Sequence, residues 1–228
     1  MKVNSKLRGA FTLIELLIVI AIIGILASAS MPAFNSIRER GNRTKDLSNI
    51  KNILLACRAF AVDYDGLFPS YPTDGDGEEG GKFGTSTEAF NELVPDYMDT
   101  EVVFWIQTKH PDKMLPPNED GEVEGKENVY AYVTGQTDTG YSRSPLVADG
   151  LMEGPGTYGE YHPWLKSKRA IIGYVGGHAQ EEVLTEASPG ASVRSKDGRT
   201  RNIFTQREEG TEGSGWLDVP VDNVLLPD

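Results

Sequence analysis

The residue best placed to do chemistry is a single carboxylate, Glu15, the only formally charged residue between Phe11 and Phe34. Burying a carboxylate in an apolar segment of bilayer length costs about 2.5–3.5 kcal/mol on insertion scales, so such a group is expected to have a partner and a function. The alternative is an acid that caps the start of a helix or is tolerated near a membrane face. Its position well inside the apolar run favours the functional role.

A second candidate for chemistry is an acidic loop, in which residues 74–79 read Asp-Gly-Asp-Gly-Glu-Glu. Carboxylates spaced by glycines can fold around Ca²⁺, which prefers hard oxygen ligands. The candidate calcium ligands are therefore Asp74, Asp76 and Glu78. The full helix–loop–helix calcium pattern is absent, and a solvated acidic loop is the alternative. Residues 118–122, Asn-Glu-Asp-Gly-Glu, are a second and weaker candidate.

The remaining reactive residue types are scattered. His110, His162 and His178 lack the spacing of a zinc site, and the sequence contains neither a nucleophile elbow nor a Walker loop. Cys57 is the only cysteine, so no intramolecular disulfide can form; a small buried apolar residue is the expected role, with an intermolecular bridge or an accessible thiol as the alternative. The sequence predicts that the protein is not an enzyme.

The N-terminal residues carry a family resemblance. Residues 8–17 read Arg-Gly-Ala-Phe-Thr-Leu-Ile-Glu-Leu-Leu. This segment resembles the N-terminus of type IV prepilins and type II secretion pseudopilins, in which a basic leader is cut before an N-methylated residue. The resemblance places the cut between Ala10 and Phe11, with Phe11 methylated and Gly9 within the recognition site. Ala10 departs from the glycine usual in the family, but a cut after Gly9 would break the register of the motif.

Three further residues match the family pattern: Glu15, Gly24 and Pro32. The resemblance implies that Glu15 offers its carboxylate to the amine of Phe11 in a neighbouring subunit, which would also set the axial register of a filament. Gly24 and Pro32 weaken the helix between them, since proline costs about 3 kcal/mol in a helix interior. The resemblance implies that this stretch can melt locally when it is packed in a filament.

The chain divides into four parts. Residues 1–10 form a leader, residues 11–34 a transmembrane or filament-core helix, residues 35–65 an amphipathic continuation, and residues 66–228 an acidic globular head. The continuation carries apolar residues at spacings of three and four, which are Leu47, Ile50, Leu54, Cys57, Ala61 and Tyr64. Gly66 and Pro69 are expected to end the helix.

The head is predicted to be α+β. A short helix follows the capping sequence 85–88, and strands are expected at Val102–Ile106, 129–133, Ile171–Val175 and His178–Leu184. Gly176 and Gly177 indicate a hairpin turn between the last two strands. Residues 111–127 and 186–215 are expected to be loops. The predicted architecture is pilin-like, a long N-terminal helix packed on a small antiparallel sheet with long loops.

Charge separates the chain into regions of opposite sign. The leader and residues 35–63 are each basic, whereas residues 64–228 hold thirty acidic and thirteen basic residues, a net charge of −17. So acidic a head argues against nucleic-acid binding. The basic cluster in residues 38–58 is expected either to be a solvated stem near anionic lipid headgroups or to attract acidic neighbours in a filament.

The resemblance implies a structural function, most specifically that of a type II secretion pseudopilin. Its implied partners are further copies of the same chain in a helical filament, a prepilin peptidase, an inner-membrane assembly platform and minor pseudopilins. The implied location is the bacterial inner membrane, with a single span, a cytoplasmic leader and an extracytoplasmic head. The alternative is an extracytoplasmic binding protein that is membrane-anchored or is released by signal peptidase after residues 27–29, Ala-Ser-Ala.

Overall fold

The computed structural model describes residues 12–70, 82–107, 114–195, 198–200, 202–211 and 214–228, without the side chains of residues 29, 30, 32 and 33. The chain forms two units, Met1–Gly41 (the stem unit) and Asn42–Asp228 (the head unit). Within the described ranges, no helix combines the length and the apolar character that crossing a membrane requires.

The longest element is helix α1, Leu13–Asp63, whose 51 residues include Gly24 and Pro32. The helix ends as the sequence predicts. Gly66 has a φ of +84°, and its N–H donates to the carbonyl of Ala61 at 2.8 Å. Glycine adopts this left-handed conformation without a steric penalty, which makes it a common helix terminator.

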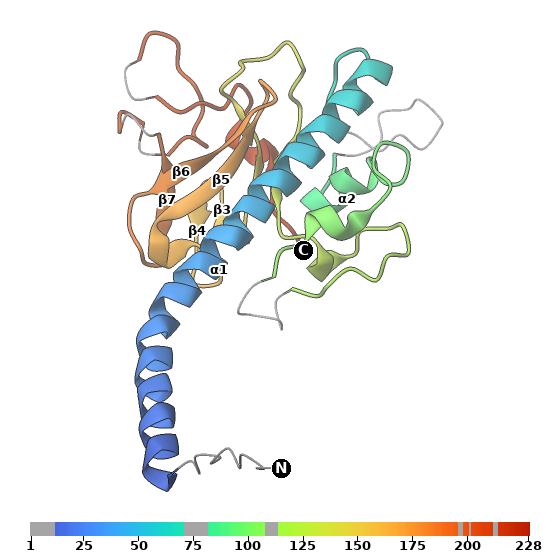
Figure 1. Cartoon of the computed structure of the whole chain (residues 1–228). Helices are drawn as coiled ribbons and strands as arrows, with labels where there is room; N and C mark the ends of the chain where they lie inside the picture. Colours follow the sequence, from blue (N-terminus) through green and yellow to red (C-terminus); the bar gives the residue numbers. More distant parts are fainter. Residues whose placement is uncertain (1–11, 71–81, 108–113, 196–197, 201, 212–213) are drawn as a thin grey trace, which may run out of the picture. The chain divides into compact units, whose positions relative to one another are not determined.

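The head unit is built on one antiparallel sheet of eight strands in the order β3-β4-β7-β6-β5-β2-β1-β8 (Figure 1). The strands are β1 (Ala131–Val133), β2 (Pro145–Ala148), β3 (Met152–Gly154), β4 (Thr157–Tyr158), β5 (Arg169–Tyr174), β6 (Ala179–Leu184), β7 (Ala191–Arg194) and β8 (Val224–Leu225). The pilin-like α+β prediction is confirmed, although the sheet has more strands than the sequence analysis identified.

The sheet buries both of its faces, and β5 shows how. Ile171 belongs to the cluster that contains Ile50 and Leu54 of α1, whereas Ile172 and Tyr174 belong to a second cluster on the opposite face. Gly173 also faces α1, since a Cβ at this position would lie 2.6 Å from Cγ2 of Ile50. The absence of a side chain at residue 173 therefore allows α1 to approach the sheet closely.

The opposite face of the sheet is covered by the C-terminal part of the chain. Ile203, Phe204, Trp216 and Leu217 belong to the second cluster, together with residues of β5 and β7. Because both faces are covered at β5, this strand alternates between two apolar environments rather than between core and solvent.

Two local predictions in the head unit are confirmed. Helix α2, Ser86–Asn91, begins after Thr85, whose hydroxyl accepts from the N–H of Glu88 at 3.3 Å. The carboxylate of Glu88 accepts from the N–H of Gly84 at 2.6 Å, one residue earlier than a capping box requires. Strands β5 and β6 form the predicted hairpin, with Gly177 at a φ of +79° in the turn.

Two other local predictions are wrong. Residues 102–106 do not form a strand; Glu101–Phe104 is a 3₁₀ helix, η1, in which the hydroxyl of Thr100 accepts from the N–H of Val102 at 3.2 Å. The cap at Thr100 satisfies the backbone locally and lets Phe104 enter the core, so the β-rich composition is overridden. Strand β7 lies within residues 186–215, which were predicted to be a loop. The short 3₁₀ helices are η2 (Gly125–Glu127), η3 (Leu165–Ser167) and η4 (Val221–Asn223).

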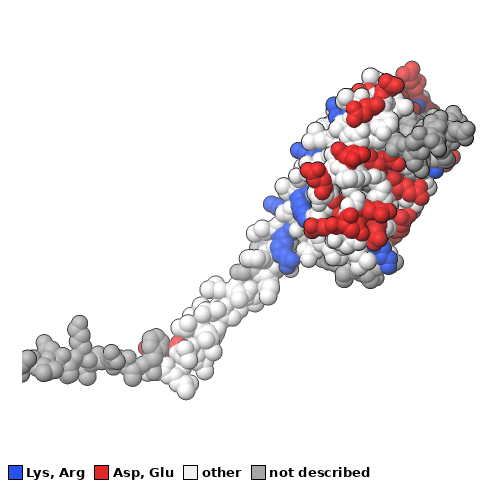
Figure 2. Space-filling view, turned by 90° about the vertical axis from the view of Figure 1, so that its right-hand side faces the viewer, with Lys and Arg blue, Asp and Glu red and all other residues white. Residues whose placement is uncertain are grey.

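Acidic side chains gather on the side of the head unit that carries α2 (Figure 2). The described residues of this side, 82–107 and 114–127, contain ten carboxylates against two lysines. This side of the head unit is therefore strongly acidic.

Candidate functional site

The first candidate site is the start of α1, where Glu15 forms a capping box with Thr12. The Glu15 carboxylate accepts from both the N–H and the hydroxyl of Thr12 at 2.8 Å, and the Thr12 hydroxyl accepts from the N–H of Glu15 at 3.3 Å. This is the local alternative that the sequence analysis left open. In the single chain, the carboxylate therefore has partners within its own first turn.

The other residues of this predicted site are only partly visible. Gly9, Ala10 and Phe11 lie outside the described residues. Gly24 lies within α1, with no atom within 4 Å of the position that its Cβ would occupy. Pro32 lies within the bounds of α1, and its side chain is not described. The arrangement of the processing residues around Glu15 therefore lies outside the described residues.

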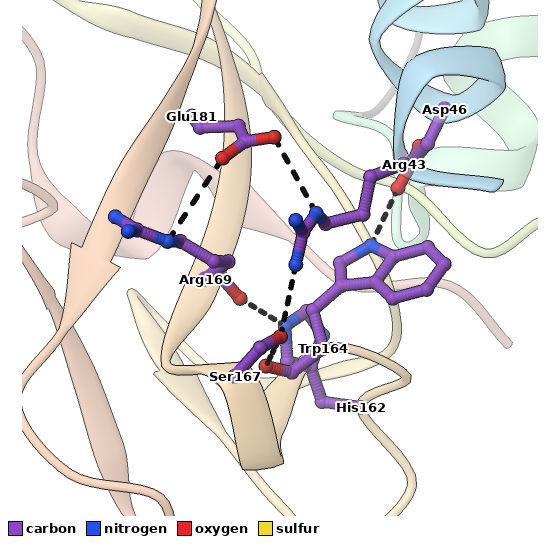
Figure 3. A network of polar contacts seen from close by, with 7 residues as sticks. All are labelled: Arg43, Asp46, His162, Trp164, Ser167, Arg169 and Glu181. Carbon is purple, nitrogen blue, oxygen red and sulfur yellow. Dashed lines mark hydrogen bonds and ion pairs between the residues drawn. The ribbon is translucent and has the colours of Figure 1, made fainter. Parts of the chain in front are cut away.

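The second candidate site fixes α1 to the sheet, and it was not predicted. Asp46, fully buried on α1, accepts from the hydroxyl of Tyr130 at 2.8 Å. It also accepts from the indole N–H of Trp164 at 2.9 Å (Figure 3). The phenol of Tyr130 also accepts from the side-chain amide of Asn49 at 3.3 Å. A buried carboxylate needs such donors, because an unsatisfied polar group in the core costs about 1–3 kcal/mol or more.

An ion-paired group lies beside this buried acid. Arg43, one turn before Asp46, approaches Glu181 of β6 at 3.4 Å and donates to the hydroxyl of Ser167 at 3.1 Å (Figure 3). Arg169 of β5 approaches the other carboxylate oxygen of Glu181 at 3.9 Å. Because Glu181 is partly exposed, the ion pairs themselves contribute little, on the order of 0–1 kcal/mol each. Their geometry fixes the rotation of α1 above β5 and β6.

A second buried acid, Asp149, lies directly after β2 and faces Asp46. One oxygen of Asp149 accepts from the hydroxyl of Tyr158 at 2.9 Å, while Oδ2 has no donor among the described residues. Asp46 and Asp149 interact electrostatically, and burial raises the pKa of Asp149 to about 7. Burial, reinforced by Asp149, also raises the pKa of Asp46 well above its usual value. We expect the two carboxyl groups to share one proton, because both pKa values rise and Oδ2 of Asp149 has no other donor among the described residues.

His162 completes the buried polar group. Its ring nitrogens lie 2.9 Å from the carbonyl of Gly150 and 2.8 Å from the carbonyl of Arg169. Burial lowers the pKa of His162, whereas the two carbonyls and Asp46 oppose that shift. These contacts hold the segment after β4 against β5. Both ring nitrogens face backbone carbonyls, and a neutral imidazole, with its single N–H, donates to only one of them.

The predicted calcium ligands Asp74, Asp76 and Glu78 lie outside the described residues. The weaker candidate, residues 118–122, forms a tight loop instead. Asn118 and Asp120 accept from the N–H groups of Asp120 and Glu122 at 3.0 and 3.1 Å. In the described part of the chain, His, Cys, Asp and Glu residues nowhere form a group of three or more that could hold a metal ion.

The buried acid group left one signal in the sequence. Asp46 lies four residues before Ile50 and seven before Ile53, so a carboxylate occupies the apolar stripe of an amphipathic helix. Its partners could not be named in advance, because Trp164 lies 118 residues away in the sequence. Cys57 is buried as predicted.

The comparisons with known proteins concern the N-terminal part of the chain. The family described as Prokaryotic N-terminal methylation motif matches residues 5–31. Type IV major pilin protein PilA of Myxococcus xanthus is 42% identical over 27% of this chain and 28% of its own length. Type IV major fimbrial protein FimA of Dichelobacter nodosus is 35% identical over 40% of this chain and 59% of its own length.

Type II secretion system core protein G of Escherichia coli is 35% identical over 35% of this chain and 51% of its own length. The matches thus span between about a quarter and three fifths of these curated relatives. No solved structure matches the chain.

The fold is pilin-like: a long N-terminal helix, whose start overlaps the matched methylation motif, packs on an antiparallel sheet. The chain is a distant homologue of type IV pilins and of a type II secretion pseudopilin. The motif match and these similarities favour a structural role over an enzymatic one. The motif also implies a precursor anchored in the inner membrane.

Proposed function

We propose that this chain is a pseudopilin of a type II secretion system, which assembles through its N-terminal helix into a secretion filament. The observation that carries the proposal is the methylation motif at residues 5–31, which contains the start of a long helix with Glu15 in its first turn. The similarity to core protein G supports the secretion role. The single cysteine favours a pseudopilin over a pilin whose head is closed by a disulfide.

In this proposal the precursor spans the inner membrane through residues 11–34, with its leader in the cytoplasm. A prepilin peptidase cuts between Ala10 and Phe11 and methylates Phe11. The stem unit supports such an anchor, because its large apolar side chains are exposed along much of the helix; Leu13, Ile14 and Ile25 are 81%, 64% and 68% exposed. Side chains of this kind are stable only in lipid or against other apolar helices.

Assembly would exchange the local partners of Glu15 for a charged one. Cleavage creates an amine at Phe11, next to the Thr12 backbone that now binds the Glu15 carboxylate. A charge-assisted bond between Glu15 and the amine of a neighbouring chain is stronger than a neutral one. An inner-membrane platform and minor pseudopilins would supply the assembly machinery, and Gly24 and Pro32 would allow the packed helix to deform.

The N-terminal residue and the intact mass of the mature protein test the processing step. We expect a chain that begins at Phe11 and carries one additional methyl group. A chain that begins at Ser30 would indicate release by signal peptidase, and a secreted binding protein would then replace the filament model.

A type IV surface pilus is the second candidate function, because two of the similar proteins are type IV major pilins. Deletion of the chain separates the two candidates. A pseudopilin deletion retains secreted enzymes inside the cell and leaves surface pili intact. A pilin deletion removes surface pili and leaves enzyme secretion intact.

We also propose that Asp74, Asp76 and Glu78 bind calcium in the head, as the acid–glycine pattern suggests. The test is the thermal unfolding of the full chain with and without calcium. We expect the unfolding temperature to rise with calcium, and the rise to disappear in Asp74→Asn/Asp76→Asn. Equal responses of the two proteins to calcium would refute these ligands.

A further inference from the structure

The outward side of α1 within the head unit presents a continuous exposed surface. Lys51, Leu55 and Val62 follow one another at spacings of four and seven, which places them on one side of the helix. Leu55 and Val62 are 65% and 83% exposed. We call this surface the outer ridge, and Arg58 lies at its flank, where it donates to the carbonyl of Val175 at 2.9 Å.

Apolar exposure in the described head unit is concentrated near this ridge. Besides Leu55 and Val62, the exposed large apolar side chains are Tyr64 and Leu67, just after α1, and Leu115. Isolated exposed leucines are ordinary, but a cluster along one element indicates a surface that contacts another molecule. This part of α1 is also basic, since Lys45, Lys51 and Arg58 are exposed against one exposed acid, Asp63, while Asp46 is buried.

The second surface is the acidic side that carries α2 (Figure 2). Its exposed carboxylates are Glu88, Asp96, Asp99, Glu119, Asp120, Glu122 and Glu124. Leu115 belongs to the same side and is 51% exposed, next to Pro116 and Pro117. We call this surface the acidic face. The acidic face is complementary to the outer ridge, because its charge is opposite and it also exposes an apolar side chain.

We propose that the outer ridge of one copy docks on the acidic face of a second copy, with Leu55 and Val62 packed near Leu115. The two surfaces are different parts of the same molecule, so the contact is heterologous. Contacts of this kind do not pair off into closed dimers; they continue into rings or open helical arrays. The contact rests on the proposed filament function, and it adds a link between heads to the link between stems at Glu15.

Cross-linking of cysteine variants in cells that process and assemble the full chain tests the contact. The double variant Leu55→Cys/Leu115→Cys should yield a ladder of dimers, trimers and longer species with a short bifunctional maleimide. Either single variant alone should remain monomeric, because a heterologous contact never brings two copies of the same residue together. All of these substitutions are at exposed residues, so the core is unchanged. The matched control is Ala187→Cys/Leu115→Cys, since Ala187 is exposed on the turn between β6 and β7.

Charge provides the second readout. Lys51→Glu in the Leu55→Cys/Leu115→Cys background should lower the ladder yield several-fold, and adding Asp120→Lys should restore part of it. The yield should also fall as ionic strength rises, because exposed charges are screened over about 8–10 Å in ordinary buffers.

Absence of the ladder, or an equal ladder from the Ala187 control, would overturn the contact. A dimer from Leu55→Cys alone would do the same, since it would indicate a symmetric pair. Electron microscopy of the same cells separates this failure from failure of the proposed function. Filaments without a ladder would refute only the contact between heads, whereas cells without filaments in every variant and in the unmodified protein would refute filament assembly itself.

Discussion

The paired buried acids make the stability of the head unit depend on pH in a direction opposite to that of most carboxylates. Burial raises the pKa of Asp149 from 3.8 to about 7, and that of Asp46 also rises. The folded chain therefore binds more protons than the unfolded chain between about pH 4 and pH 7. The free energy of unfolding then falls as pH rises through this window. The folded state is at its most stable, as far as these two acids are concerned, below about pH 4, where they are protonated in both states.

The structure sets an upper limit to the size of this effect. A shift of about three units at about 1.4 kcal/mol per unit corresponds to about 4 kcal/mol from Asp149. The substitution Asp149→Asn removes this pH-dependent loss of stability. The asparagine carbonyl can accept from Tyr158, and its amide can donate to Asp46, so the two side chains no longer need a shared proton. We expect the variant to match the unmodified protein near pH 4 and to exceed it in stability above pH 7.

Urea unfolding of the full chain in detergent, followed by tryptophan fluorescence from about pH 4 to pH 8, measures the difference. The buried His162 acts in the opposite direction, because burial lowers its pKa and stability then rises with pH up to about its ordinary value of 6.5. This contribution is common to both proteins and cancels in their difference. Asp96→Asn, at an exposed carboxylate, is the control and should leave the profile unchanged. Parallel profiles for Asp149→Asn and the unmodified protein would refute the shared proton.

Three further substitutions probe the contacts of α1. Trp164→Phe removes one donor to Asp46 and should destabilise the head by about 1–3 kcal/mol in urea unfolding, and more above pH 7 than below; a change independent of pH would refute the coupling. Gly173→Ala places a methyl group 2.6 Å from Cγ2 of Ile50 and should cost about 1–3 kcal/mol. Gly84→Ala, whose Cβ would meet only the Glu88 carboxylate at 3.7 and 3.8 Å, should cost less, and equal costs would show that α1 does not press on β5. Glu15→Leu should leave cleavage and methylation intact but abolish filaments, as counted by electron microscopy, while Thr12→Val should retain them; normal filaments from Glu15→Leu would exclude the carboxylate from assembly.

The elements that sequence reasoning identified are those set by local signals. The amphipathic stripe and Gly66 predicted α1 and its end, and paired glycines predicted the hairpin of β5 and β6. Strands such as β4 and β8 have two residues each, too few to show a period, and they form only because distant segments pair with them. Residues 102–106 have β-type composition, but the cap at Thr100 and the burial of Phe104 produce a 3₁₀ turn.

The same contrast separates the two candidate sites. The Glu15 site lies within a contiguous motif, so its chemistry can be predicted from a few neighbouring residues. The buried group around Asp46 draws on α1, β1, β2 and η3, and no spacing within the sequence links its members. Asp46 is costly in an apolar stripe unless the sheet supplies Tyr130 and Trp164, so the acid selects the one rotation of α1 that satisfies it. Because Leu55 and Val62 lie on the opposite side of the helix, this rotation also fixes them outward. The buried acids thus determine which surface of α1 is available to a second copy of the chain.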